Sequence, residues 1–422
     1  MKPDKGVLGN NLRVVTTQMP GVESVTVMIL VKSGSRYEDK RTNGVAHFAE
    51  HMFFKGTKSR PSATDISSLI DGIGGEFNAF TSKEFTGYYV KAAKDHLNLC
   101  LDVVSDMLMN SLFAQEEIDR ERNVINEEIR MYLDTPMRYV PEVYDALLYG
   151  DQPLGWDTAG TLDSLKNINR KDFFKYIDDY YTPSNMLVVI SGGVSPDKAQ
   201  VTADEYMGRI KDRLAKGFKK VTVSQNKPQV KIFHKDSEQA HLCLGVRSYP
   251  AAHKNRYKIT VLNTILGASM SSRLFVQLRE RRGLGYYVRS GVEEYHDAGS
   301  LVAQAGVMPK NIDQAIRVIL DEFGKLAVEP VSEVELKKAK EYLKGKLILE
   351  MEDSKEVSNL FGLMELLEGK IRDQKELIAN IEKVSAEDIQ TTAKEIFVDQ
   401  SLNLAIVGPY KDKTKFERNL KF

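Results

Sequence analysis

Two stretches of the chain have the dense apolar composition of buried β-strands, and a fixed offset separates them. Residues 25–31 read Val-Thr-Val-Met-Ile-Leu-Val, and residues 240–246 read Ala-His-Leu-Cys-Leu-Gly-Val, 215 positions later (240 − 25). The helical pattern of residues 96–108 returns in residues 311–323 at the same offset (311 − 96 = 215). In each half the pattern predicts strand, helix, helix, strand, strand, helix. We therefore expect an α+β fold of two homologous domains related by internal duplication.

A polar segment separates the two repeats. Residues 216–220 and 224–228 combine charged and polar side chains with Gly and Pro, a composition typical of a linker. We expect a first domain over residues 1–215, a linker over residues 216–228 and a second domain over residues 229–422.

Composition narrows the class of protein. The 422 residues contain 59 Lys plus Arg and 59 Asp plus Glu, so no strongly one-signed surface is available to steer ligands. Nothing around the short basic cluster at 279–282 resembles a nucleic-acid-binding module. Cys100 and Cys243 are isolated, which fits a reducing compartment or indifference to redox conditions. The N-terminal sequence has no continuous apolar core of an export signal, and no run reaches the roughly 18 apolar residues that span a membrane. We expect a cytoplasmic protein with no nucleic-acid or membrane partner.

Candidate chemistry concentrates in the segment His47-Phe48-Ala49-Glu50-His51. On a helix, positions i and i+4 share one face and lie about 6 Å apart along the axis. His47 and His51 can therefore converge on one metal ion with Glu50 beside it. Zinc takes neutral imidazole nitrogens and, in catalytic sites, leaves one position open for water, whose proton a nearby carboxylate can accept.

The order of the motif is informative, because the glutamate directly precedes the second histidine in the inverted arrangement H-x-x-E-H. A chance cluster of polar residues on a helix is the alternative. The flanking residues 44–46 and 52–54 are apolar, apart from Gly44, and would carry the histidines into a largely buried setting. Polar groups without partners are costly there, and a metal ion would satisfy them.

Two histidines leave zinc one protein ligand short, and an acidic run further along the chain supplies candidates. Glu121 and Glu128 are seven residues apart, which is two helical turns, so they share a face. Glu128 can then bind the metal while Glu121 holds one of the ligands by a hydrogen bond. Glu127 is the rival ligand, and a solvated acidic helix face is the alternative without function.

These motifs resemble those of the pitrilysin and mitochondrial processing peptidase family of zinc peptidases, in its half-length bacterial form. Glu128 follows His51 by 77 positions (128 − 51) within an E-R-x-V-I-x-x-E run. Residues 74–81, Gly-Gly-Glu-Phe-Asn-Ala-Phe-Thr, and residues 278–287, Leu-Arg-Glu-Arg-Arg-Gly-Leu-Gly-Tyr-Tyr, also follow the family pattern. The resemblance therefore covers nearly the whole chain.

The resemblance implies a role for each of these residues. One zinc ion per chain would be held by His47, His51 and Glu128, with Glu50 as general base and Glu121 supporting a ligand. A peptide substrate would add as an extra strand to an edge strand that carries Asn78, Ala79 and Phe80. Substrate contact and stabilisation of the developing oxyanion would come from Arg279 and Tyr286.

Simpler interpretations of the last two groups stay open. Gly74 and Gly75 can serve only a turn, and the alternation over residues 77–89 can mark only a half-buried strand. Residues 279–282 can form an ordinary solvated helix end with a cap at Gly283.

The two halves differ in their chemistry. At the 215 offset, His47, Glu50 and His51 correspond to the apolar residues Leu262, Ile265 and Leu266. The stretch opposite residues 279–286 is residues 64–71, which contain neither arginine nor tyrosine. Only the first half therefore carries the metal residues, and only the second carries the Arg/Tyr pair.

The resemblance further implies that a half-length chain forms a half-chamber that pairs with a second copy, the zinc domain of one copy facing the Arg/Tyr domain of the other. Because this chain carries both sets, a homodimer suffices. We expect a zinc metalloendopeptidase that hydrolyses peptides or presequence-like segments. The alternatives are the catalytic half of an obligate heterodimer and a non-catalytic binding or assembly subunit.

Overall fold

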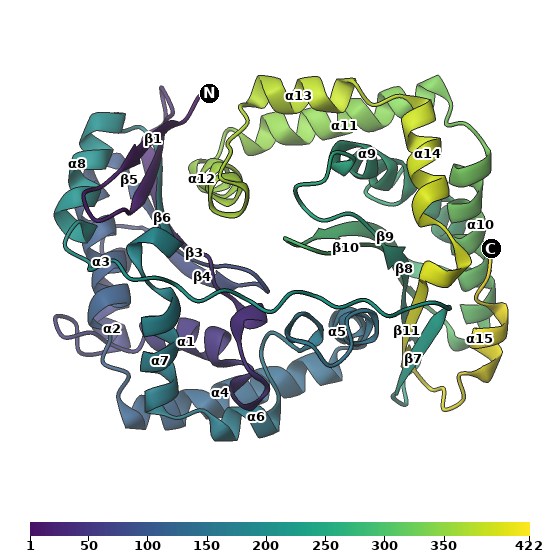
Figure 1. Ribbon diagram of the computed structural model, residues 1–422, viewed down its shortest axis with the longest axis horizontal. Coiled ribbons are helices and arrows are strands. Elements are labelled where there is room, and N and C mark those ends of the chain that lie inside the picture. Colours follow the sequence, from purple (N-terminus) through teal and green to yellow (C-terminus); the bar gives the residue numbers. More distant parts are fainter. The chain divides into compact units, whose positions relative to one another are not determined.

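The computed structural model describes residues 1–422, which form two compact units, each built from three segments (Figure 1). The first unit comprises Met1–Ile129, Asp157–Lys219 and Leu347–Glu376. The second comprises Arg130–Trp156, Lys220–Lys346 and Leu377–Phe422. None of the helices has both the length and the apolar composition needed to cross a membrane.

The first unit is organised around a six-stranded sheet with the order β1-β2-β6-β3-β5-β4. Its strands are β1 (Asp4–Val7), β2 (Arg13–Gln18), β3 (Ser24–Val31), β4 (Glu76–Thr81), β5 (Thr86–Ala93) and β6 (Met186–Gly192). β2 and β6 run parallel, and the other neighbours are antiparallel. All seven residues of β6 and seven of the eight in β3 are buried, because helices cover both faces of the sheet at its centre.

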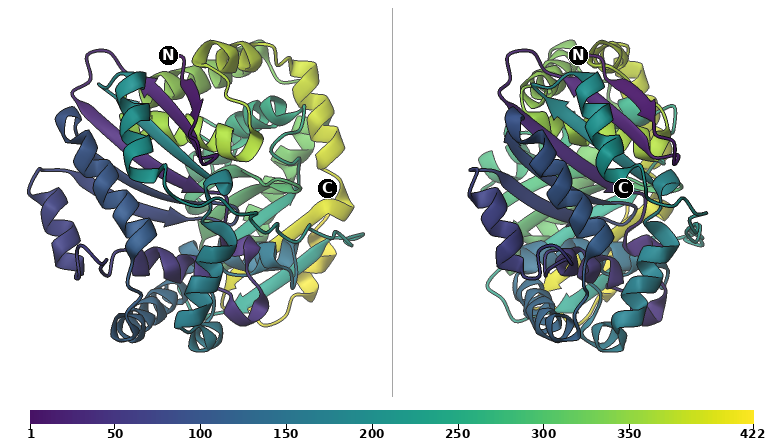
Figure 2. Two further views of the ribbon diagram at one scale, coloured as in Figure 1. Left: turned by 60° about the vertical axis from the view of Figure 1, so that its left-hand side comes forward. Right: turned by 90° about the vertical axis from the view of Figure 1, so that its left-hand side faces the viewer.

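Helices α3 (Leu97–Asn110) and α8 (Pro196–Met207) cover one face of this sheet, and α12 (Ser354–Leu363) covers the other, as Figure 1 shows. In the right-hand view of Figure 2, α3 and α8 lie in front of the strands. Of the remaining helices of the unit, the first two pack against the edge strand β4. These remaining helices are α1 (Val45–Phe53), α2 (Ala63–Asp71), α4 (Gln115–Asp134, which continues into the second unit), α6 (Leu162–Asn167) and α7 (Arg170–Tyr180).

The second unit contains a five-stranded sheet with the order β7-β11-β8-β10-β9. Its strands are β7 (Gln229–His234), β8 (Ala240–Arg247), β9 (Gly285–Glu294), β10 (Gly299–Val307) and β11 (Leu402–Gly408). Its helices are α5 (Pro136–Leu148), α9 (Arg256–Leu266), α10 (Ile312–Val328), α14 (Ala386–Ile396) and α15 (Thr414–Asn419). Two further helices, α11 (Glu333–Glu350) and α13 (Gln374–Glu382), cross the division between the units.

Alternate residues of β8 enter two separate cores. Leu242 and Leu244 pack with α9, α10 and α14 on one face of the sheet. Cys243 packs with α5 on the opposite face. A strand covered on both faces is apolar on both, which explains the continuous apolar run of residues 240–246.

The predicted duplication is confirmed. The five strands β2, β6, β3, β5 and β4 correspond in order and direction to β7, β11, β8, β10 and β9, including the parallel first pair. β3 and β8 begin 216 residues apart (240 − 24), and α3 and α10 begin 215 apart (312 − 97). The offset read from the sequence is therefore correct to within one residue. The fold consists of two homologous α+β domains, as expected.

The segments that make up each unit are less simple than a division into residues 1–215 and 229–422. Helix α5, from the first half of the chain, packs on the second sheet, and α12, from the second half, packs on the first sheet. The chain also passes from the first unit to the second between Lys219 and Lys220, inside the expected linker of residues 216–228. Each half of the sequence thus supplies the helix that closes the other half's sheet.

Candidate metal centre and active site

Helix α1 carries the central motif, and a glycine determines where it begins. Gly44 has a φ of +97°, which side-chain-bearing residues rarely adopt, and a Cβ there would lie 2.7 Å from the carbonyl oxygen of Ala159. Gly44 has no side chain to cap the helix. The buried carboxyl group of Glu38 takes this role, and its two oxygens accept hydrogen bonds from the amides of Gly44 and Ala46, each at 2.7 Å.

The two faces of α1 have different tasks. Val45, Ala46, Phe48, Ala49, Met52 and Phe53 are buried and fix the helix in the core of the first unit. The side chains of His47 and His51 are only 14% and 21% exposed, yet they lie on the face that this core leaves open. The helix therefore presents two nearly buried imidazoles on a rigid support.

Three donor atoms converge at this face. His47 Nε2 lies 3.3 Å from His51 Nε2, and Glu128 Oε2 lies 3.8 Å from the first nitrogen and 3.7 Å from the second. Zinc ligands at about 2.0–2.1 Å in a tetrahedron are separated by about 3.3–3.4 Å. The three atoms thus lie close to the positions of three tetrahedral ligands, and His47, His51 and Glu128 could hold a metal ion.

The protonation of His47 fits this donor set. Burial, followed by the neighbouring His51, lowers the pKa of His47 to about 3, so its ring is neutral at physiological pH. A neutral imidazole is the form that binds zinc. Its Nδ1 is buried and has no hydrogen-bond partner, so only Nε2 is engaged, on the side of the other two donors. Two imidazoles and a carboxylate form a donor set that suits zinc.

Glu121 lies behind His51. Its Oε1 accepts a hydrogen bond from His51 Nδ1 at 2.9 Å, and its Oε2 is paired with Lys55 Nζ at 2.7 Å. Burial acts to raise the pKa of Glu121, but the bonds from His51 and Lys55 outweigh it and lower the pKa. The ionised carboxylate thus orients the His51 ring so that Nε2 faces Glu128 and His47.

The structure distinguishes Glu128 from Glu127 as a possible metal ligand. The Glu128 side chain is 23% exposed and faces the imidazoles, whereas Glu127 is exposed and does not belong to the donor group. The seven-residue spacing from Glu121 accounts for this difference, because it returns Glu128 to the same face of α4.

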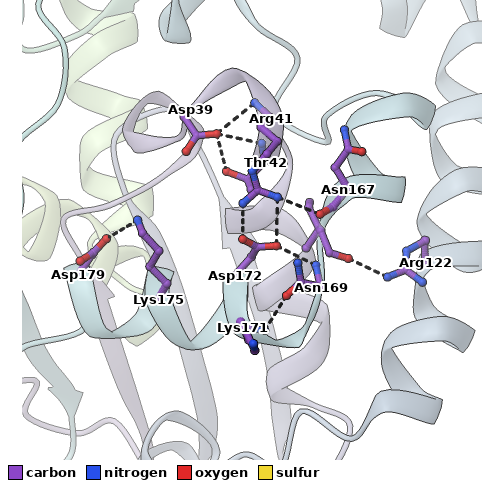
Figure 3. Close-up of polar contacts among 11 residues, drawn as sticks. Asp39, Arg41, Thr42, Arg122, Asn167, Asn169, Lys171, Asp172, Lys175 and Asp179 are labelled. Atoms are coloured by element: carbon purple, nitrogen blue, oxygen red, sulfur yellow. Dashed lines mark hydrogen bonds and ion pairs between the residues drawn. The ribbon is translucent and has the colours of Figure 1, made fainter.

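Arg41, which precedes α1, and Arg122 of α4 both make polar contacts around the end of α6 (Figure 3). Arg122, next to Glu121, donates to the carbonyl oxygens of Leu165 and Ile168 at 3.1 and 2.9 Å. Arg41, just before α1, donates to the carbonyl oxygen of Asn167 at 3.1 Å and is paired with Asp172. The end of α6 and the residue after it thus contact both the segment that precedes α1 and helix α4.

Glu50 is oriented by a residue of β4. Thr81 Oγ1 donates a hydrogen bond to Glu50 Oε2, while Oε1 has no hydrogen bond. Burial raises the pKa of Glu50 and the Thr81 bond acts in the opposite direction. A carboxylate with one oxygen fixed and the other available, beside the donor group, can accept a proton from water.

Asn78, Ala79 and Phe80 lie on β4, which is an edge strand of the first sheet. Their partners on β5 leave the other side of β4 without a neighbouring strand. Asn78 is exposed and its Oδ1 accepts a hydrogen bond from the Ala79 amide at 2.8 Å, while Phe80 lies over Gly87. The position of these three residues is the one that addition of a peptide strand requires.

Arg279 and Tyr286 belong to the second unit. Arg279 lies in the π-helical segment Phe275–Glu280, with its guanidinium carbon 5.0 Å from the centre of the Phe275 ring. Tyr286 is the second residue of β9 and is 58% exposed. Between them Gly283 has a φ of +58° and its amide bonds to the Arg279 carbonyl, so the glycine cap considered from the sequence is present.

Three residues that support the site are absent from the sequence-based set: Glu38, Lys55 and Thr81. Lys55 lies four residues after His51 but two residues beyond the end of α1, so helical spacing does not place it beside Glu121. Thr81 directly follows the Asn-Ala-Phe segment, although nothing in the sequence pairs it with Glu50. Glu38 is a single carboxylate in a loop and carries no periodic signal.

Comparison with known proteins gives consistent matches along the chain. A family model described as insulinase (peptidase family M16) matches residues 13–162, and one described as peptidase M16 inactive domain matches residues 167–343. The chain is 37% identical to an uncharacterized zinc protease of Bacillus subtilis, over 95% of this chain and 97% of that protein. It is 35% identical to an uncharacterized zinc protease of Mycobacterium leprae, over 98% and 93%.

Solved structures agree in fold. A protease from Helicobacter pylori superimposes with a TM-score of 0.90 at 25% identity, covering 97% of this chain and 99% of that chain. A Pseudomonas fluorescens structure described as a peptidase M16 inactive domain has the same TM-score and coverage at 16% identity, a likeness of fold alone.

Proposed function

The chain belongs to the insulinase family of peptidases, peptidase family M16, and from this premise we propose that it is a zinc-dependent endopeptidase. The observation that carries the proposal is the triangle of donor atoms from His47, His51 and Glu128, with edges of 3.3, 3.7 and 3.8 Å. Glu50 lies on α1 with the two histidines, and one of its carboxylate oxygens accepts a hydrogen bond from Thr81. A metal site with an adjacent carboxylate, beside an edge strand, suits peptide hydrolysis.

Each residue has a proposed task. A zinc ion at His47, His51 and Glu128, one per chain, would supply Lewis acidity toward water and the scissile carbonyl. Glu50 accepts the water proton and returns it to the leaving amine. Tyr286 and Arg279 donate hydrogen bonds to the substrate carbonyl and backbone. One such donor is typically worth about 2.7–4 kcal/mol in the transition state.

The substrate follows from how it is held. A peptide that adds to β4 at Asn78, Ala79 and Phe80 is bound through its main chain, so many sequences are accepted provided that the segment is extended. We propose peptides and presequence-like segments as substrates, enclosed in a dimer of two identical chains. Each site would combine the first unit of one copy with the second unit of its partner. The free thiols of Cys100 and Cys243 are buried, in keeping with the proposed cytoplasmic location.

Glu50→Gln tests the proposal. Because Glu50 accepts the proton without binding the metal, the variant should keep about one zinc per chain and lose nearly all hydrolysis of a quenched fluorescent peptide, a loss of about 10²–10⁴-fold. Glu116→Gln is the matched control, since Glu116 is exposed on α4. Loss of zinc together with activity would make Glu50 a ligand. A wild-type chain that binds zinc and hydrolyses no peptide would leave the heterodimer and the binding subunit as the better interpretations.

A further inference from the structure

The edge strand β4 and the helix α1 are connected at two places. One connection is direct, from Thr81 Oγ1 at the end of β4 to Glu50 Oε2 in the middle of α1. It is the only hydrogen bond of the Glu50 carboxylate among the residues described. The proposed base therefore owes its orientation to the strand on which the peptide is expected to bind.

The second connection runs through the turn that follows β4. The carbonyl oxygens of Ser82 and Lys83 accept hydrogen bonds from the amides of Ser35 and Arg36, at 3.1 and 2.9 Å. Two residues further on, Glu38 accepts from the amides of Gly44 and Ala46 at the start of α1. A side chain at Gly34 could not be accommodated, since its Cβ would lie 2.2 Å from the Ser82 carbonyl oxygen. The turn thus fixes the start of the helix as Thr81 fixes its middle.

The side chains of β4 divide according to this arrangement. Alternate residues of a strand point to opposite faces. Thr81 bonds to α1, and Phe77, four residues earlier on the same face, has its ring 5.7 Å from that of Phe54 just after α1. β4 therefore uses one set of side chains to hold α1, while its main chain remains the element to which a peptide strand would add.

We propose that Thr81 is a positioning residue, which holds the Glu50 carboxylate in register with a peptide bound on β4. The inference rests on the proposed function, because it gives Glu50 the role of base. A base must be held within about 0.5 Å and 10–20° of its productive geometry. Without the Thr81 bond the carboxylate can rotate about its side-chain torsions. Its distance and angle to a peptide bound on β4 are then no longer fixed.

Thr81→Val tests the inference, since it removes the hydroxyl and keeps the branched shape. We expect kcat to fall about 10- to 100-fold, as for a misplacement of about 1 Å. KM, zinc content and the thermal unfolding midpoint should stay close to those of the wild type. Thr81→Ser restores the donor and should recover most of kcat, which a purely structural role of the threonine would not produce.

Thr86→Val is the matched control, because Thr86 faces Thr81 across the strand pair and donates to the carbonyl oxygen of Ser33 instead of to Glu50. It should lower the unfolding midpoint and leave kcat unchanged. A normal kcat in Thr81→Val, a Thr81→Ser variant no better than Thr81→Val, or an effect confined to KM would each overturn the positioning role.

The two hypotheses fail in different ways. If Glu50→Gln retains hydrolysis, the proposed function is wrong whatever Thr81→Val does. If Glu50→Gln is inactive and Thr81→Val is normal, only the positioning role is wrong. Adding Thr81→Val to Glu50→Gln should cause no further loss of residual activity, because the hydroxyl then has no carboxylate to orient; an additive loss would contradict the inference.

Discussion

Three glutamates of α4, Glu121, Glu127 and Glu128, offer a test of the proposed metal centre that does not depend on turnover. Glu121 bonds to His51, Glu128 faces both imidazoles, and Glu127 is exposed. Replacing each in turn by glutamine keeps the size of the side chain and removes one negative charge from the same helix. The three variants therefore differ mainly in where that charge was located.

The contacts give the expected magnitudes. In Glu121→Gln the amide oxygen can still accept from His51, but the charge that stabilises the oriented ring is lost and Lys55 loses its carboxylate partner. Removal of such a supporting partner typically weakens metal binding by 10–100-fold, about 1.4–2.8 kcal/mol. Glu128→Gln removes a ligand and should weaken zinc binding by more than about 100-fold. Glu127→Gln should change it by less than about twofold, because the side chain is exposed.

Competition with a chromophoric zinc chelator at fixed pH measures all three dissociation constants, and circular dichroism verifies that each variant is folded. The order Glu128, Glu121, Glu127 is the result that the geometry requires. A stronger effect at Glu127 than at Glu128 would transfer the ligand role to Glu127. Equal effects at all three positions would mean that only the net charge of α4 matters, and the argument from the donor triangle would be refuted.

Three further predictions concern other parts of the molecule. Burial raises the pKa of Glu38 to about 8 from its usual 4.5, so the folded state holds this proton after the unfolded state releases it. Its contribution to stability is complete below pH 4.5 and falls by up to about 1.4 kcal/mol per pH unit up to pH 8. Urea unfolding at pH 5, 6 and 7 should show that the unfolding free energy falls less with pH in Glu38→Gln than in the wild type. Equal pH slopes in the two proteins would contradict the raised pKa of Glu38. Arg122→Ala removes the bonds to the carbonyl oxygens of Leu165 in α6 and of Ile168 just after it, and should cost about 1–3 kcal/mol of unfolding free energy. Arg120→Ala, whose side chain is 66% exposed, should cost under about 0.5 kcal/mol. Similar losses in the two variants would contradict the anchoring role of Arg122. Mixing Glu50→Gln with Tyr286→Phe chains should restore roughly a quarter of wild-type activity if each site combines two chains, and no recovery after subunit exchange verified by mass would exclude that arrangement.

The convergence of His47, His51 and Glu128 was predictable from sequence because the intervals between the residues concerned are helical. A spacing of four residues places His47 and His51 on one face of α1, and a spacing of seven does the same for Glu121 and Glu128 on α4. The sequence alone left Glu127 as a rival, since adjacent residues differ only by a rotation that depends on the packing of α4. Ile125 and Ile129, both buried, fix that rotation.

Residues that act across elements could not be found in the same way. Thr81 and Glu50 are 31 positions apart on a strand and a helix. Glu38 lies in a loop without periodicity. The sequence also does not show that α5 packs on the second sheet and α12 on the first. The apolar face of a helix does not specify which of two apolar sheets it covers. Period, spacing and duplication are local or repetitive signals, whereas these contacts arise only when the sheets have formed.

The two homologous helices α1 and α9 show what the metal centre requires of the fold. In α9, Leu262, Ile265 and Leu266, which correspond to His47, Glu50 and His51, are 0%, 3% and 0% exposed and contribute to the core of the second unit. Burial of each such side chain stabilises a fold by about 1.5–3 kcal/mol, a contribution that α1 gives up on its polar face. In the first unit, polar contacts orient α1 and its polar side chains instead. Glu38 bonds to the start of the helix, Glu121 to one histidine and Thr81 to the glutamate of the motif. A site built on that helix therefore depends on partners contributed by three other segments, which is why changes at Glu121 or Thr81 should alter metal binding or turnover more than they alter the stability of the fold.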